Sequence, residues 1–171
     1  MSTLVLVGYA SSYGSTQEVA EVVAATLREQ GVEVDLQPIR EVQSLASYSA
    51  VVLGAPLYMF HWHKAALRFL ARYQSILSGG LPVAIFAGGP IGSGVEKEWQ
   101  EVRRELDQEL AKFPWLKPVS VQLIGGKFDP ARLRFPYKLL PALRRMPASD
   151  LRDWKAIRAW ASNLAVQLQP A

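Results

Sequence analysis

The chain has 171 residues, and its 19 basic side chains outnumber its 15 acidic ones, for a formal net charge of +4. This length suits one domain, residues 1–171, and the half of the residues that are apolar indicate a globular fold with a sizeable core. The absence of cysteine excludes disulfides, thiolate metal sites and thiol catalysis. Because no apolar run is long enough to span a bilayer and the N-terminus lacks a signal-peptide pattern, we expect a cytoplasmic protein.

Strand and helix patterns alternate along the chain. Apolar runs and apolar–polar alternation predict five strands, at 3–8, 32–38, 50–54, 82–87 and 119–124. Helical periodicity predicts helices at 16–30, 63–76, 96–112 and 150–168, with Gly31 ending the first and Asp150 capping the last. The alternation predicts an α/β three-layer sandwich, a five-stranded parallel sheet with helices on both faces. In strand order 2-1-3-4-5, the loops after strands one, three and four meet at one edge, where ligands of such folds bind.

The loop after the first strand has the composition of a phosphate site. It consists of Ser11, Ser12, Tyr13, Gly14, Ser15 and Thr16. The first helical turn offers unpaired N–H groups and the positive end of the helix dipole, and the hydroxyls add donors. The loop has no Lys or Arg, so neutral donors would hold the phosphate. The spacing fits neither a P-loop nor the dinucleotide fingerprint. The pattern [ST]-x-x-G-x-[ST] resembles the FMN-phosphate loop of the flavodoxin superfamily, and a polar turn that only caps the helix is the alternative.

The two other loops at this edge suit a flat ring such as a flavin. The loop after the third strand is rich in aromatic and apolar residues that could pack on the ring: Pro56, Leu57, Tyr58, Met59, Phe60 and Trp62. Of these, Tyr58, Phe60 and Trp62 are the candidates for stacking, and packing in the core is the alternative for all three. The loop after the fourth strand would bring its backbone amides to the ring's second edge, through Gly88, Gly89, Pro90, Ile91 and Gly92.

Two histidines lie at the end of the aromatic loop. His61 and His63 lack a third ligand nearby, so we expect no metal site. A histidine close to a flavin or to an anionic substrate is the functional interpretation, and a solvent-facing histidine at the start of a helix is the alternative.

Motifs beyond these loops sharpen the resemblance to the flavodoxin superfamily. Gly54-Ala55-Pro56-Leu57-Tyr58 with His61-Trp62-His63, then Gly125-Gly126-Lys127-Phe128 and Asp153-Trp154, are similar to the branch that contains bacterial quinone-dependent protoporphyrinogen IX dehydrogenase. The resemblance covers nearly the whole chain and implies a flavodoxin-like fold and an FMN cofactor. The chain departs from that branch after the fourth strand, where the branch has a long basic loop and this sequence has the helix 96–112. The resemblance therefore implies FMN more directly than it implies protoporphyrinogen as the substrate.

A basic, aromatic segment follows the fifth strand. Between Lys127 and Ser149 the sequence has six Lys or Arg against one Asp, with apolar residues interleaved. We expect it to meet an acidic substrate, such as a porphyrin carboxylate, or an anionic membrane surface, while a solvated loop is the alternative. Lys127 and Arg132, with His61 and His63, are the candidate substrate contacts. No nucleic-acid-binding motif accompanies the charge.

The sequence as a whole predicts an FMN-dependent oxidoreductase, possible substrates being protoporphyrinogen IX or a quinone. The flavin would supply the chemistry, so we expect no catalytic residue from the chain itself. A flavodoxin-type electron-transfer protein without its own small-molecule substrate is the alternative, although such carriers tend to be acidic and this chain has a sequence pI near 9.5. Its expected place is the cytoplasm or the inner face of the membrane.

Overall fold

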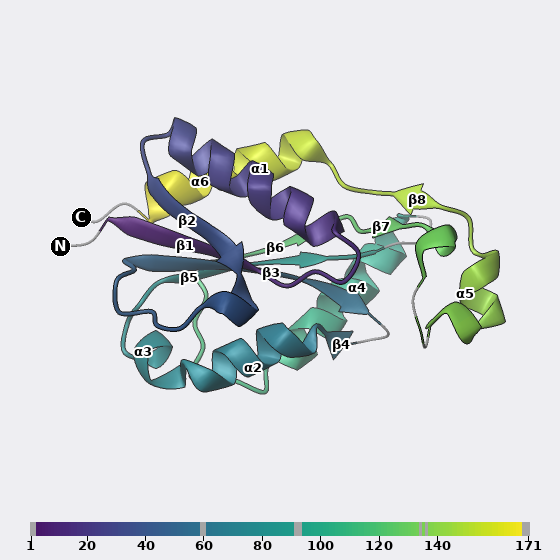
Figure 1. Cartoon of the computed structure of the whole chain (residues 1–171), viewed down its shortest axis with the longest axis horizontal. Coiled ribbons are helices and arrows are strands. Elements are labelled where there is room, and N and C mark those ends of the chain that lie inside the picture. Colours follow the sequence, from purple (N-terminus) through teal and green to yellow (C-terminus); the bar gives the residue numbers. More distant parts are fainter. Residues whose placement is uncertain (1–2, 59–60, 91–93, 134, 136, 169–171) are drawn as a thin grey trace.

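The protein is described by a computed structural model, which covers residues 3–58, 61–90, 94–133, 135 and 137–168. A parallel sheet lies between two layers of helices (Figure 1). Its strands are β1 (Leu4–Tyr9), β2 (Glu33–Pro38), β3 (Ala50–Tyr58), β5 (Val83–Gly88) and β6 (Ser120–Ile124). They are ordered β2-β1-β3-β5-β6, which, counted over these five strands, is the predicted 2-1-3-4-5. The predicted α/β sandwich is confirmed, and the central sheet has one further strand that was not predicted: β4 (His61–Trp62) pairs antiparallel with β3.

The central strands β1, β3 and β5 are buried on both faces because helices cover both, whereas the edge strands β2 and β6 are only half-buried. Helices α1 (Ser15–Glu29) and α6 (Trp154–Gln167) lie on one face, and α2 (Lys64–Arg72), α3 (Gln74–Ser78) and α4 (Glu96–Leu110) lie on the other (Figure 1). Alternate residues of one strand enter different cores: Val5 and Val7 pack toward α1 and α6, whereas Leu6 packs in the opposite core. This explains why the central strands are apolar throughout.

Three predicted boundaries are wrong. The strand predicted to end at Gly54 continues to Tyr58, because β3 keeps its pairing with β5 as far as Pro56 and Gly88. The helix predicted at 63–76 is divided at Tyr73 into α2 and α3. The last helix begins at Trp154 and is capped by Asp153, whose carboxylate accepts the Ala156 N–H. Asp150, the predicted cap, instead belongs to β8.

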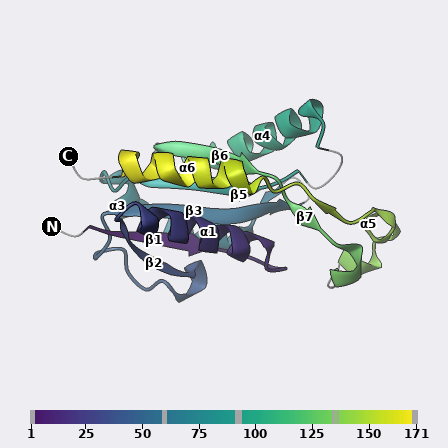
Figure 2. The ribbon, with the colours of Figure 1, turned by 90° about the horizontal axis from the view of Figure 1, so that it is seen from above.

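The basic segment forms a projection at the carboxyl end of the sheet, opposite the two termini (Figures 1 and 2). We call residues 127–150 the roof. It contains β7 (Lys127–Phe128), η2 (Pro130–Arg132), η3 (Tyr137–Leu139), α5 (Pro141–Arg145) and β8 (Ser149–Asp150). Only β7 and β8 pair with each other, over two residues each, and neither η2 nor α5 has a buried residue. The roof is therefore joined to the sheet mainly through its base.

Candidate functional site

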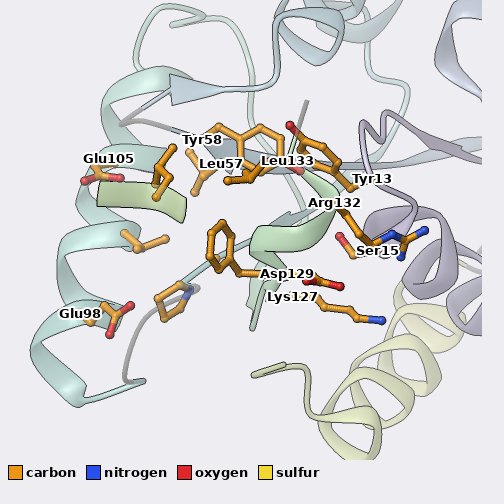
Figure 3. Close-up of a pocket in the computed structure, with 15 residues that line it drawn as sticks. Tyr13, Ser15, Leu57, Tyr58, Glu98, Glu105, Lys127, Asp129, Arg132 and Leu133 are labelled. Atoms are coloured by element: carbon orange, nitrogen blue, oxygen red, sulfur yellow. The ribbon is translucent and has the colours of Figure 1, made fainter. Parts of the chain in front are cut away.

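A cavity of about 320 Å³ opens where the strand ends meet the roof (Figure 3). The loop edges of the sheet contribute Tyr13, Ser15, Leu57, Tyr58, Gly89 and Pro90. Helix α4 contributes Glu98, Val102 and Glu105, and the roof contributes Lys127, Phe128, Asp129, Arg132, Leu133 and Leu143. A volume of this size lies within the range of pockets for small organic molecules, and the mixture of aromatic and aliphatic walls suits a flat ring system.

The 11–16 loop leaves the N-terminus of α1 open to an anion. Gly14 takes the left-handed conformation (φ +88°), and its N–H donates to Ser11 Oγ at 2.9 Å. The first α-helical bond then runs from Glu18 N–H to Gly14 O, and no side-chain hydrogen bond caps this helix. The N–H groups of the first turn therefore remain available, with the positive end of the dipole behind them.

Next to this loop lies a buried arginine that the sequence patterns did not indicate as part of the site. Arg152 directs Nη1 to Ser15 O and to Glu18 Oε2, both at 3.2 Å, while its Nε and Nη2 bind the Asp150 carboxylate at 2.9 and 2.8 Å. Its side chain is only 4% exposed. The hydrogen bonds from Arg152 hold the pKa of Asp150 below its usual value, against the opposing effect of burial. Two carboxylates thus neutralise the guanidinium, and it fastens the base of the roof to α1.

The two sides of the cavity differ in charge. Figure 3 shows Glu98 and Glu105 on the side of α4, and Lys127 and Arg132 on the side of the 11–16 loop, with Asp129 between these two basic residues. Burial, with a smaller contribution from the negative charge of Glu101, raises the pKa of Glu105. A ligand with an anionic edge would be oriented by this arrangement, because its carboxylates would be repelled by the two glutamates of α4 and attracted by Lys127 and Arg132, which outnumber Asp129 on their side.

The predicted site residues fall into five groups. Eight of them line the cavity: Tyr13, Ser15, Leu57, Tyr58, Gly89, Pro90, Lys127 and Arg132. Thr16, Pro56 and Gly88 line a smaller adjoining cleft with Arg152, and Ser11, Ser12 and Gly14 form the loop beside it. Met59, Phe60, Ile91 and Gly92 lie outside the described residues.

The remaining three predicted residues lie away from the cavity. Trp62 is 1% exposed and donates its indole N–H to Ala55 O at 2.9 Å, so it belongs to the core, the alternative expected for it. His61 is exposed and bonds the buried Glu109 carboxylate. His63 contacts Ser12 in the 11–16 loop instead of the cavity. Neither histidine is among the residues that line the cavity.

Sequence motifs carried little information on the α4 side of the cavity. Val102, Glu98 and Glu105 follow the spacing of one helix face, and only the tertiary fold brings that face to the strand ends.

Among the described residues, no cluster of three His, Asp or Glu side chains could hold a metal ion. In that same part of the chain, every helix is too short or too polar to cross a bilayer.

Comparisons with known proteins agree with this geometry. A family profile described as Flavodoxin domain matches residues 6–142. The chain belongs to the flavodoxin domain family. Within solved structures, this flavodoxin-domain chain is similar to a mutant flavodoxin from Pseudomonas aeruginosa (TM-score 0.61, 14% identity, covering 96% of this chain and 98% of that one). It is also similar to flavodoxin 2 from Bacillus cereus (TM-score 0.56, 19% identity, 96% of each chain). These likenesses show the fold.

Curated relatives carry an enzyme name. Protoporphyrinogen IX dehydrogenase (quinone) of Escherichia coli strain K12 is 23% identical over 176 residues, which cover 96% of this flavodoxin-domain chain and 95% of the relative. The protein of the same name from Leishmania major is 23% identical over 168 residues, covering 92% of this chain and 72% of the relative.

Flavodoxin domains bind FMN, and the residues of this chain fit that cofactor. The 11–16 loop provides uncapped helix N–H groups and hydroxyls for a phosphate. The neighbouring cavity has the apolar walls that a flavin ring requires, and Tyr13 and Tyr58 meet there edge to face with their centroids 6.0 Å apart. Because the loop and the cavity share Ser15, one molecule can reach both.

Proposed function

We propose that the protein is an FMN-dependent oxidoreductase that acts on its own small-molecule substrate. The observation that carries this proposal is the cavity beside the roof: the apolar space next to the 11–16 loop is lined by α4 and the roof, with basic groups on one side. A carrier that passes electrons only to other proteins needs no apolar cavity lined by such additional elements. The names of the curated relatives support the same choice.

The chain's own residues would bind, orient and shield. Bound FMN supplies hydride or single-electron transfer. The 11–16 loop would hold the phosphate through N–H groups and hydroxyls, and Leu57, Tyr58, Gly89 and Pro90 would border the ring. Leu133 and Leu143 of the roof would exclude water from the reacting face.

For the substrate we propose a protoporphyrinogen-type dicarboxylate with a quinone as electron acceptor. Apolar walls suit both an aromatic quinone and a macrocycle, and Lys127 and Arg132 supply counter-charges for carboxylates on one side only. An electron-transfer protein remains the competing hypothesis, favoured by the flavodoxin neighbours.

One assay separates the two functions. Purified FMN-loaded protein is mixed anaerobically with protoporphyrinogen IX and menadione, and porphyrin fluorescence is followed. We expect turnover that falls about tenfold or more in kcat/KM in the double variant K127A/R132A, because two charge-assisted contacts are lost. The matched control K138A/R144A removes two roof cations that are not among the residues lining the cavity. Wild-type protein without turnover would favour the carrier.

We further propose that the roof meets an anionic membrane surface, where a lipophilic quinone resides. Phe135, Leu139 and Leu140 are 72%, 62% and 41% exposed, and Lys138, Arg144 and Arg145 lie between or beside them. Sedimentation with phosphatidylglycerol vesicles tests this contact. Binding should be lost with phosphatidylcholine vesicles and weakened in F135S/L139S; equal binding to both lipids would contradict the proposal.

A further inference from the structure

We propose that His63 is a positioning residue of the 11–16 loop: its Nε2–H donates to Ser12 Oγ and so turns the Ser12 hydroxyl proton outward, toward the phosphate of a flavin nucleotide. The inference rests on the proposed FMN function and deepens it. It also replaces the role first expected for His63, a contact to substrate.

The hydrogen bonds of the His63 ring determine its tautomer. His63 precedes α2, and its Nδ1 accepts the backbone N–H of Ala65 at 3.1 Å. An atom that accepts a hydrogen bond carries no proton, so the proton of the neutral ring is on Nε2. Nε2 lies 3.2 Å from Ser12 Oγ, and it is therefore the donor of that bond. Burial lowers the pKa of His63, which keeps the ring neutral at pH 7.

The bond from His63 leaves the Ser12 hydroxyl proton uncommitted. A hydroxyl has one proton and two lone pairs, and the His63 Nε2–H occupies one lone pair. Within the described residues, Ser12 Oγ has no second hydrogen bond. Its proton is therefore free to donate to a ligand or to water.

The Ser11 hydroxyl also accepts an internal hydrogen bond, from a different donor. Its Oγ accepts the Gly14 N–H at 2.9 Å, so its hydroxyl proton is also left for an outside acceptor. Ser11 and Ser12 thus each use one hydroxyl lone pair as an internal acceptor and keep the hydroxyl proton for an outside acceptor. A phosphate dianion accepts hydrogen bonds and donates none, so these two protons match it.

His63 is fixed firmly enough to orient a partner. Its backbone N–H donates to Pro56 O at 3.1 Å, and its backbone carbonyl accepts the Ala66 N–H at 3.0 Å. The ring is thereby held between the end of β3 and the first turn of α2, 51 positions from Ser12 in the sequence. A contact this distant in sequence links the second loop of the site to the first.

The test compares FMN with riboflavin, which lacks the phosphate. Flavin-free protein is titrated with each, and quenching of flavin fluorescence gives the two affinities. In H63N, the shorter amide should still accept the Ala65 N–H and cap α2 but should not reach Ser12. We expect FMN affinity to fall about 3- to 10-fold, the worth of one hydrogen bond, with riboflavin affinity unchanged. H63Q, whose Nε2 reaches farther, should recover most of the FMN affinity.

Ser12 supplies the second arm. S12A should lower FMN affinity by a similar factor. S12A/H63N should bind FMN as tightly as S12A alone, because both changes remove the same His63–Ser12 hydrogen bond. Equal losses for FMN and riboflavin in H63N, or an unchanged FMN affinity, would overturn the role of His63 and leave the proposed function intact. Wild-type protein that binds neither flavin would overturn the proposed function and this role with it.

Discussion

Two regions border the same cavity and are built in opposite ways. The loop edge follows directly from buried strands: Thr16 is 2% exposed, and the interiors of β1 and β3 are inaccessible to solvent. The roof has no buried residue in η2 or α5 and only a two-residue strand pair. The difference suggests a division of tasks. A rigid edge provides the fixed geometry that a cofactor needs, while a lightly anchored segment is free to adapt to a substrate.

The roof is nevertheless tied down at its base. Arg152 joins Asp150 in β8 to Ser15 and Glu18 in α1. Gly125 packs so closely on the backbone that a Cβ there would lie 1.8 Å from Leu151 O. Sheet and roof therefore differ in how many contacts hold them, and substitutions in each should have different effects.

The largest loss of stability is expected in the sheet, for Gly54→Ala. A Cβ at this position would lie 1.9 Å from Cζ of Phe86, whose ring is fully buried and packs edge to face on Trp160. We expect the free energy of unfolding in urea to fall by about 3 kcal/mol, the upper range for overpacking. If the clash is the cause, G54A/F86L should be more stable than G54A. A double variant no more stable than the single one would contradict this explanation.

The contrast between the two regions also describes what the sequence could and could not predict. Strand order and the 11–16 loop followed from local signals: apolar runs, Gly14, and hydroxyls before a helical period. The extension of β3 was missed because Gly54 and Pro56 are typical strand breakers, although neighbouring strands keep them paired. Arg152 and the α4 face of the cavity come from long-range packing, for which the local pattern carries no signal.

The next largest effect is expected at the base of the roof, for Arg152→Ala. The change leaves Ser15 O and two carboxylates without their donor, and we expect a loss of about 1–3 kcal/mol, less than for a fully buried pair because both carboxylates are half exposed. Amide hydrogen exchange should accelerate in residues 127–150 and much less in the sheet. Arg152→Lys keeps the positive charge but loses the planar guanidinium that bonds several acceptors at once. Its stability should therefore lie between those of the wild type and Arg152→Ala. Uniformly faster amide exchange across the molecule would contradict a local role of Arg152 in anchoring the roof.

Acid should weaken the ion pair between Arg152 and Asp150. Because Arg152 lowers the pKa of Asp150 in the folded state, this carboxylate contributes stability above its usual pKa of 3.8, and the contribution is lost as the pH falls through the lowered value. Asp150→Asn should therefore cost about 0.5–1 kcal/mol at pH 7, a modest figure because the carboxylate is partly exposed, and should flatten the fall of stability below pH 4. Urea unfolding at several pH values measures both. Parallel curves for D150N and the wild type would exclude Asp150 as the titrating group.

The smallest effect on stability is expected within the roof itself, and it sharpens the comparison most. Leu143 lines the cavity from α5, a helix with no buried residue, so Leu143→Ala should change the free energy of unfolding by less than about 0.5 kcal/mol. The same change removes apolar surface that would cover a ligand, and we expect KM for an apolar substrate to rise about fivefold. Leu139→Ala is the matched control, because Leu139 is 62% exposed and is not among the residues lining the cavity. If L143A and L139A behave alike in KM, the roof does not contact the substrate; if L143A unfolds like a core variant, the roof is as firmly built as the sheet.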